Sequence, residues 1–445
     1  MEENFKLNYK RTFYMGFAFF SILMLWQMYN YYCPIFLKTL LGDNKDYIIG
    51  IIMAADNILA IWMLPLFGAL SDKTHTKWGK RMPYMVIGMI ASAIIFPLVA
   101  LMFYFNSLVG VITMMGVILI IMNIYRNPAV ALMPDLTPKP LRSKANGIIN
   151  LVGYIGAVLG GGIALVLGML IKDEYIRAIV AFASASFFMI IAVIILIINI
   201  NEPKILEEMK PELERGELYS TSFTKENDKT LNKQDKINIL ILLICILFLF
   251  VSFNAVESFY SIFCKNVFEN DASEFYTKIP VGTIIMAGLP LSSIITFLCA
   301  INLPTKIGRK LTVIIGIICM LVGFGTIVLE GLFIGYNAII FLLCIIICGV
   351  GWALINANTY PMMVEVASSS NTGRYTGLYY TFSMLAQSIT PIIAGLLITV
   401  KGKYDILFIY AFFTMLIAFI IFLFFKERKV KIEAKKGFEA FEDND

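Results

Sequence analysis

The sequence predicts an all-α membrane protein with twelve transmembrane helices arranged as two six-helix halves. Of its 445 residues 59% are hydrophobic and only 15% are charged, whereas soluble domains carry about 25% charged residues. The apolar residues come in long blocks without alternation, which excludes an outer-membrane barrel. Their number is sufficient for twelve spans at about 20 residues each. In addition, the two halves of the sequence resemble each other, which predicts an internal duplication.

The apolar blocks predict the spans in chain order. We expect them at 12–38, 47–70, 83–105, 108–134, 145–171, 176–200, 238–264, 280–302, 310–332, 336–362, 374–400 and 403–425. The first block is too long for a cleavable signal peptide and should remain as the first span. The domains expected are an N-terminal six-helix bundle (1–200), a cytoplasmic linker (201–237), a C-terminal six-helix bundle (238–425) and a cytoplasmic tail (426–445). The linker is rich in Glu and Lys, which predicts a solvated segment with room for a surface helix.

Basic residues set the expected orientation of the chain. With the N-terminus in the cytoplasm, the cytoplasmic segments hold 27 Lys and Arg residues and the external loops hold 8. This bias predicts that both termini are cytoplasmic. Short external loops are typical of a multi-pass protein of the bacterial plasma (inner) membrane. The net charge of +5 is small and gives no indication of nucleic-acid binding.

The remaining composition argues against several classes of site. The seven cysteines lie mostly in apolar blocks without a CxxC pair, and the chain has one histidine. We therefore expect the thiols to be reduced and buried. We expect neither a metal nor another cofactor. No nucleophile–base pair or phosphate-binding loop is recognisable, so we do not expect an enzyme.

An internal repeat relates the two halves. The segments WGKR at 78–81 and IGRK at 307–310 lie 229 residues apart. MPDL at 133–136 and MVEV at 363–366 lie 230 apart, as do Gly147 and Gly377. IFLK at 35–38 and IFCK at 262–265 are separated by 227. Matches in chain order at a nearly constant offset predict two six-helix halves related by a parallel repeat, which is a transporter architecture.

Three motifs carry a family resemblance. Segment 68–83 reads GALSDKTHTKWGKRMP, NPAVALMPDLT at 127–137 is followed by RSKANG at 142–147, and 376–380 reads TGLYY. These resemble the motifs of major facilitator superfamily transporters of the glycoside–pentoside–hexuronide:cation symporter and sucrose:proton symporter type. The resemblance spans both halves. It implies the major facilitator fold and a secondary transporter that imports a sugar by alternating access.

Charges at the cytoplasmic helix ends are candidate gating groups. Asp135 and Glu365 occupy matching ends in the two halves, and Asp72 ends the second span beside a basic loop. We expect a latch that holds one access state and breaks in the other; the alternative is plain surface charge. The candidate gating residues are Asp72, Lys77, Lys80, Arg81, Asp135, Arg142, Arg309, Glu365 and Arg374.

Three ionisable residues lie at membrane depth, where a charge is costly and suggests function by default. They are Asp56, Arg126 and Glu257, and we expect them to serve proton coupling. At 1.5 Å per residue, Asp56 and Arg126 differ by about 9 Å in depth. Either tilt and long side chains bring them together, or water or substrate bridges them.

A polar face is expected to line a central sugar site. Gln27 and Asn30 on the first span correspond, at the offset of 227, to Asn254 and Glu257 on the seventh. Sugars bind through many hydroxyl contacts and an aromatic plate. The candidate substrate-binding residues are Trp26, Gln27, Asn30, Tyr31, Arg126, Asn127, Asn150, Asn254, Tyr379, Tyr380 and Gln387. For each amide, hydrogen bonding between helices is the alternative, and for each aromatic it is packing.

The coupling ion is inferred from a departure from the family pattern. Ala60 and Leu64 stand where sodium-coupled melibiose-type members carry two carboxylates, so the resemblance favours a proton over sodium. The expected function is proton-coupled import of a disaccharide or glycoside, such as sucrose or maltose, by a monomer in the lipid bilayer. The alternatives are an exporter or carrier of a non-sugar solute, and a membrane sensor or enzyme.

Overall fold

The computed structural model describes residues 5–227, 233–269, 281–299, 303–366 and 372–426. The first half comprises α1 (Tyr9–Leu41), α2 (Asp46–Lys73), α3 (Met82–Tyr104), α4 (Leu108–Asp135), α5 (Arg142–Leu170) and α6 (Glu174–Asn199). The linker forms α7 (Glu202–Asn227). The second half comprises α8 (Lys233–Glu257), α9 (Tyr260–Cys264), α10 (Val281–Cys299), α11 (Leu303–Ile307), α12 (Arg309–Phe333), α13 (Ala338–Val366), α14 (Thr372–Lys401) and α15 (Ile406–Leu423).

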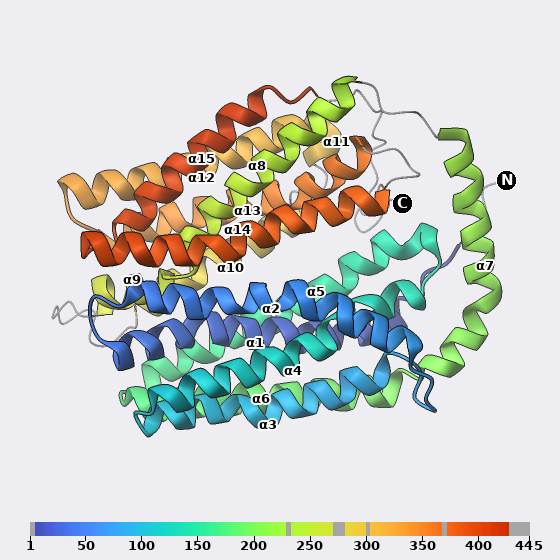
Figure 1. Cartoon of the computed structure of the whole chain (residues 1–445), viewed down its shortest axis with the longest axis horizontal. Coiled ribbons are helices and arrows are strands. Elements are labelled where there is room, and N and C mark those ends of the chain that lie inside the picture. The colour runs from blue at the N-terminus through green and yellow to red at the C-terminus, as the bar shows by residue number, and fades with distance from the viewer. Residues whose placement is uncertain (1–4, 228–232, 270–280, 300–302, 367–371, 427–445) are drawn as a thin grey trace.

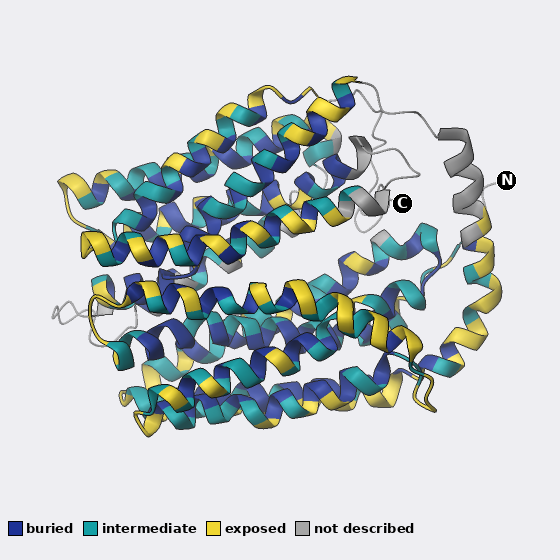
Figure 2. Ribbon diagram, in the orientation of Figure 1, coloured by how far each residue is buried: buried dark blue, intermediate teal, exposed yellow. Residues whose placement is uncertain are grey.

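The helices confirm the predicted all-α membrane fold. In the described ranges, eleven helices are long and apolar enough to cross a membrane. The remaining predicted span, 280–302, the eighth in chain order, corresponds to the apolar helix α10. Exposed residues form bands along the outer faces of the helices (Figure 2). Many of these are large and apolar, such as Ile87 and Phe333, which suits a lipid environment.

One predicted span, 238–264, is not a single continuous helix in the structure. Segment 238–264 was expected as a single helix, but α8 ends at Glu257 and α9 begins at Tyr260. In the turn, the Ser258 hydroxyl donates to the Asn254 carbonyl at 2.7 Å, and the Phe259 N–H donates to the Val256 carbonyl at 3.2 Å. A broken helix at membrane depth is tolerated where it lines a cavity.

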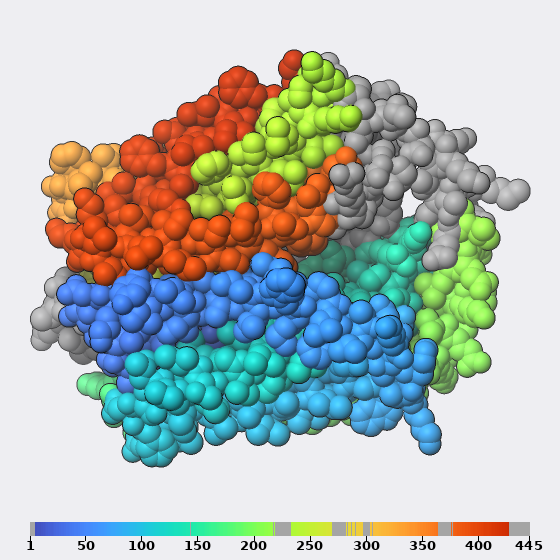
Figure 3. All heavy atoms as spheres, viewed as in Figure 1, coloured from blue at the N-terminus to red at the C-terminus, as the bar shows by residue number. Residues whose placement is uncertain are grey.

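Each half packs around its own aromatic core. In the first half, Phe36 stacks on Phe103 with ring centroids 4.1 Å apart. In the second, Phe341 lies 5.3 Å from Phe263. Figure 1 shows α1–α6 as one bundle, the helices after α7 as a second bundle, and α7 running across one end. The halves touch along α2 and α14, and Figure 3 shows a recess between them toward the α7 end.

The contact between the halves is tightest at the end where α1 finishes and α2 begins. A Cβ on Gly395 of α14 would lie 2.9 Å from the Tyr47 Cα. The Tyr404 hydroxyl donates to Asp46, and Lys38 Nζ lies 3.2 Å from the same carboxylate. We call Lys38, Asp46 and Tyr404 the end clasp, because Tyr404 belongs to the second half and the other two to the first.

Candidate functional site

A central cavity of about 270 Å³ lies between the two halves. Its walls come from α1, α2, α4, the α8 break and α14, so each half contributes side chains. The lining residues are Leu23, Trp26, Tyr29, Asn30, Met53, Asp56, Asn57, Arg126, Asn254, Glu257, Ser258, Gln387 and Pro391. Amides, hydroxyls, charges and aromatic rings thus face one space, which is the composition expected of a site for a small polar solute.

All three intramembrane charges meet at this cavity. Asp56, Arg126 and Glu257 line it together. Glu257 ends α8 at the helix break and its side chain is exposed to the cavity. Arg126 is close enough to Asp56 to act on it electrostatically. The three charges therefore share one cavity, with no ion pair between them among the described residues.

Asp56 is buried with an unused oxygen. Its side chain is only 5% exposed, and Oδ1 has no hydrogen-bond partner among the described residues. The buried Tyr29 hydroxyl, one helix away on α1, likewise has none in that part of the chain. Buried polar groups are nearly always satisfied. Asp56 and Tyr29 therefore each offer an unused polar atom at one wall of the cavity.

Arg126 is held against an aromatic ring. Its guanidinium carbon lies 5.9 Å from the centroid of Trp26, a distance at which the ring quadrupole attracts a cation. Tyr29 meets Trp26 edge to face with centroids 5.7 Å apart. Arg126 and Trp26 thus meet at the wall of the cavity that both line.

A smaller chamber of about 110 Å³ adjoins the central cavity. Asn30 and Glu257 belong to both linings. Its remaining walls are Gln27, Tyr31, Phe253, Val256, Tyr260, Ser261, Leu289 and Phe324. The sequence-predicted residues Gln27 and Tyr31 thus face this second chamber.

Four predicted substrate-binding residues lie outside both linings. Asn127 donates its amide to the Leu64 carbonyl, and Asn150 donates to the Asn146 carbonyl at 2.9 Å. Tyr379 is buried with its hydroxyl 3.2 Å from that of Thr359. Tyr380 is half exposed and its ring centroid lies 6.1 Å from that of Tyr360. For Asn127, Asn150 and Tyr379 the structure favours the alternative roles of hydrogen bonding within or between helices and of packing, which helical spacing could not exclude.

Several lining residues were missed by sequence reasoning. Asn57 and Ser258 directly follow the predicted site residues Asp56 and Glu257, so these two intramembrane charges mark their position in the sequence. The walls of the small chamber, such as Phe324 and Leu289, are apolar residues among many others. No sequence signal distinguishes them.

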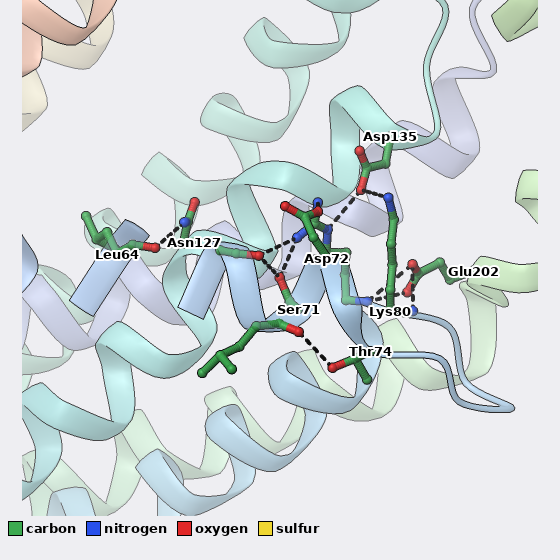
Figure 4. Close-up of polar contacts among 11 residues, drawn as sticks. Leu64, Ser71, Asp72, Thr74, Lys80, Asn127, Asp135 and Glu202 are labelled. Atoms are coloured by element: carbon green, nitrogen blue, oxygen red, sulfur yellow. Dashed lines mark hydrogen bonds and ion pairs between the residues drawn. The ribbon is translucent and has the colours of Figure 1, made fainter. Parts of the chain in front are cut away.

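The predicted latch residues form a charge cluster at the α7 end of the first half (Figure 4). Arg81 is 5% exposed; its Nε donates to Asp135 at 2.9 Å and its NH2 group donates to Asp72. Lys80 Nζ lies 3.1 Å from the same Asp135 oxygen. The cluster ties the ends of α2, α3 and α4 together within the first half, and its role as a latch stays a prediction.

A fourth element joins this cluster from the linker. Glu202 at the start of α7 accepts backbone N–H groups of Lys80 at 3.0 Å, Arg81 at 2.9 Å and Met82 at 2.9 Å. These are the free donors at the N-terminus of α3, where a carboxylate is favoured. Glu202 lies in the segment 201–237 that was expected as a solvated linker, and its charged neighbours gave no signal for this role.

The remaining gating candidates take different positions. Lys77 is exposed in the loop between α2 and α3, and Arg142 donates to the Thr137 carbonyl at 3.2 Å. Arg309, which matches the 78–81 segment in the repeat, is buried like Arg81, at 6% exposure. The side chains of Glu365 and Arg374 lie outside the described residues.

The helical bundles and the shared central cavity define a membrane transporter of the major facilitator type. The chain matches the model of a family described as MFS/sugar transport protein over residues 14–404. It therefore belongs to that family. No curated protein matches the sequence.

Solved structures support the same fold. The nucleoside transporter NupG matches with a TM-score of 0.66 and 15% identity, covering 95% of this chain and 100% of that one. An inward open conformation of the xylose transporter XylE from E. coli matches with a TM-score of 0.65 and 15% identity, covering 98% of each chain. A bacterial homologue of the iron transporter ferroportin, in an inward-facing state, matches with a TM-score of 0.67 and 13% identity, covering 95% and 100%. At these identities the likeness concerns the fold.

Proposed function

We propose that this transporter imports a sugar together with a proton by alternating access. The observation that carries the proposal is the central cavity, in which two carboxylates, one guanidinium and an aromatic plate share one space of about 270 Å³. The family match to sugar transport proteins agrees with it.

The cavity chemistry suits a sugar ring. Asn30, Asn254 and Gln387 offer amide donors and acceptors from both halves, and hydroxyl groups need both. Trp26 offers an apolar ring face to the C–H side of the sugar. Because ligands in contact with both halves bind best when the halves close, occupancy by a sugar favours the occluded state over either open state.

Asp56 and Glu257 are the proposed proton carriers. A carboxylate at membrane depth is costly when charged, so binding of a proton lowers the cost of closing the cavity around it. The guanidinium charge of Arg126 balances whichever carboxylate remains charged. A proton taken from the outside and a sugar bound together then cross in one step, and both leave toward the cytoplasm.

Two clusters are proposed to govern the two ends. We propose, from the Lys and Arg bias, that both termini are cytoplasmic and that the membrane is a bacterial plasma (inner) membrane. In this orientation the Arg81 cluster is cytoplasmic and the end clasp is external. The structure then corresponds to a state closed outside by Asp46 and Tyr404. Opening that clasp, while the two halves (1–200 and 238–425) move as units within a monomer, exposes the cavity to the outside.

The test uses purified protein in liposomes. An inward proton gradient without sodium should drive accumulation of a labelled sugar from a panel that includes sucrose and maltose, and a protonophore should abolish it. Accumulation only after sodium is added would contradict proton coupling and point to a sodium site despite Ala60 and Leu64. Failure with every sugar under both gradients would contradict import and favour an exporter or a carrier of a non-sugar solute.

A further inference from the structure

We infer that Lys265 and Glu174 form a second external contact between the two halves, related to the end clasp by the internal repeat, and that this contact holds the α5–α10 side of the gate closed. Lys265 Nζ lies 2.6 Å from Glu174 Oε1. The inference rests on the proposed alternating access. It assigns two further residues to the external gate, with a salt dependence that differs from that of the end clasp.

The ion pair joins the two halves directly. Glu174 is the first residue of α6, the last span of the first half. Lys265 follows α9, which completes the first span of the second half. In the end clasp, by contrast, the ion pair of Lys38 with Asp46 stays inside the first half, and the link across the halves is made by Tyr404.

The two contacts occupy equivalent positions in the repeat. Lys38 and Lys265 are the last residues of the repeated segments IFLK and IFCK, 227 residues apart. Glu174 and Tyr404 are 230 residues apart and lie at or just before the start of the sixth span of each half. Lys38 Nζ lies 5.5 Å from the centroid of the Tyr404 ring. In both contacts, a lysine at the end of the first span therefore meets the start of the other half's sixth span.

The two contacts differ in chemistry. Tyr404 offers a ring face to the Lys38 ammonium, and its hydroxyl donates to Asp46, whose side chain is 4% exposed. At the equivalent position Glu174 supplies a carboxylate, so the second contact is an ion pair. The side chains of Lys265 and Glu174 are 26% and 30% exposed. Because salt screens exposed charges more than buried ones, ionic strength should act mainly on the second contact.

Helix packing brings the backbones together on one side of the gate. Beside the end clasp, a Cβ on Gly395 would collide with the backbone of the first half. The ion pair lies on the other side, since Glu174 follows the end of α5 and η2 (Lys265–Glu269) contacts α10. A Cβ on Gly161 of α5 would lie nearest to α1, and one on Gly288 of α10 nearest to α13. The ion pair therefore supplies a bond across the halves where these glycines pack inside their own half.

The experiment measures distances across both sides of the gate by pulsed electron paramagnetic resonance, with the full-length protein in lipid nanodiscs. Nitroxide labels on cysteines introduced at Lys172 and Asn266 report the ion-pair side. Labels at Asp43 and Lys403 report the Tyr404 side, and all four positions are exposed. The protein without added cysteines gives the background from the native thiols.

One variant removes the ion pair and another serves as its matched control. Glu174→Gln keeps the size of the side chain and loses its charge. Asp173→Asn loses the same charge one residue earlier, and Asn retains the cap that Asp173 provides to the Ile176 N–H. In Glu174→Gln the ratio of open to closed distances should rise about two- to fivefold, the size expected for a partly exposed ion pair. It should rise at both label pairs, because the halves move as units, and Asp173→Asn should leave it unchanged.

Charge exchange and salt test the electrostatic origin of the effect. The double variant Glu174→Lys with Lys265→Glu should restore the closed distances, which also shows that the substituted chains fold. Potassium chloride at about 1 M, where the Debye length is about 3 Å, should open the gate of the unchanged protein. The same salt should change Glu174→Gln much less.

The outcomes separate this inference from the proposed function. Equal distances in Glu174→Gln and the unchanged protein, an equal effect of Asp173→Asn, or a change confined to the 172–266 pair would overturn the second contact while leaving sugar transport intact. If sugar left both distances of the unchanged protein as they are, and no sugar entered liposomes, the alternating access on which the inference rests would be contradicted.

Discussion

The carboxylate of Glu202 accepts the backbone N–H of Met82 at 2.9 Å, so the first turn of α7 holds the first turn of α3. The same carboxylate also accepts from Lys80 and Arg81. Gly79 makes room for this approach, with φ at +103° and its missing Cβ directed at the Glu202 side chain. The helical linker is therefore attached to the first half beside the Arg81 cluster.

Removing the contact between Glu202 and the N-terminus of α3 should lower the stability of the first half. Glu202→Gln keeps the shape but loses the charge at the α3 N-terminus, and Glu202→Ala leaves buried N–H groups unpaired at a cost of about 1–3 kcal/mol. We expect the midpoint of thermal unfolding to be highest for the unchanged protein, lower for Glu202→Gln and lowest for Glu202→Ala. Glu207→Gln, on the exposed face of the same helix, serves as the control. Equal midpoints for the Glu202 and Glu207 variants would contradict the attachment.

Substitution of Arg81 should destabilise the protein far more than substitution of Lys77 in the loop between α2 and α3. Arg81 is buried and pairs with Asp135, whose side chain is 23% exposed, and with the exposed Asp72, so its removal costs less than the roughly 3–5 kcal/mol of a fully buried ion pair. Arg81→Gln should lower the thermal midpoint strongly and slow sugar exchange. The exposed Lys77→Gln should leave both within error. If Lys77→Gln lowered the thermal midpoint and the rate of sugar exchange as much as Arg81→Gln, the charge of the loop alone would explain the effect.

Substitution of the two carboxylates at the cavity should abolish proton coupling while the movement of sugar across the membrane continues. Asp56→Asn and Glu257→Gln keep size and polarity but cannot release a proton. We expect at least one of them to abolish accumulation of sugar against a gradient while exchange of sugar for sugar continues. The measurement compares uphill uptake with counterflow in the same proteoliposomes. Uphill uptake at the unchanged level in both variants would rule out these residues as proton carriers.

The end clasp should govern access from the outside. Burial, together with the hydrogen bond to Asp46, raises the pKa of Tyr404 well above its ordinary value near 10. A raised pKa keeps the hydroxyl protonated, so its contribution persists below about pH 10 and is lost only at still higher pH. Tyr404→Phe removes the donor and should favour the outward-open state at every pH between 5 and 9.

Labelling of an added cysteine reports this opening. Thr399→Cys lies at the closed seam, where the Thr399 hydroxyl oxygen accepts the Tyr47 N–H at 3.1 Å. An impermeant maleimide should react faster with it when Tyr404→Phe or Gly395→Val is also present. Tyr410→Phe on the same side of the second half is the matched control. Unchanged labelling in both seam variants would contradict a clasp that holds the halves together.

Much of the fold followed from the sequence because hydrocarbon length and backbone satisfaction leave few choices for an apolar block. The break in α8 did not, because Ser258 and Phe259 are ordinary helix residues and the interruption depends on the cavity that Glu257 faces.

In the site, buried charges such as Asp56 and Arg126 were visible because they are rare in apolar spans. Asn127 and Tyr379 misled, since an amide or a phenol on a helix serves packing as readily as binding. The apolar walls of the small chamber had no signal, because they differ from lipid-facing residues only in position.

The most direct test of the account is whether sugar movement itself carries protons. Proteoliposomes in weak buffer, without sodium and without an imposed pH gradient, receive the sugar that the uptake panel identifies, and an electrode records the external pH. The account predicts that inward sugar flow makes the medium alkaline, that a protonophore abolishes the change, and that the Asp56→Asn and Glu257→Gln proteins reduce the protons moved per sugar. Sugar entry at full rate without any change in external pH would contradict it.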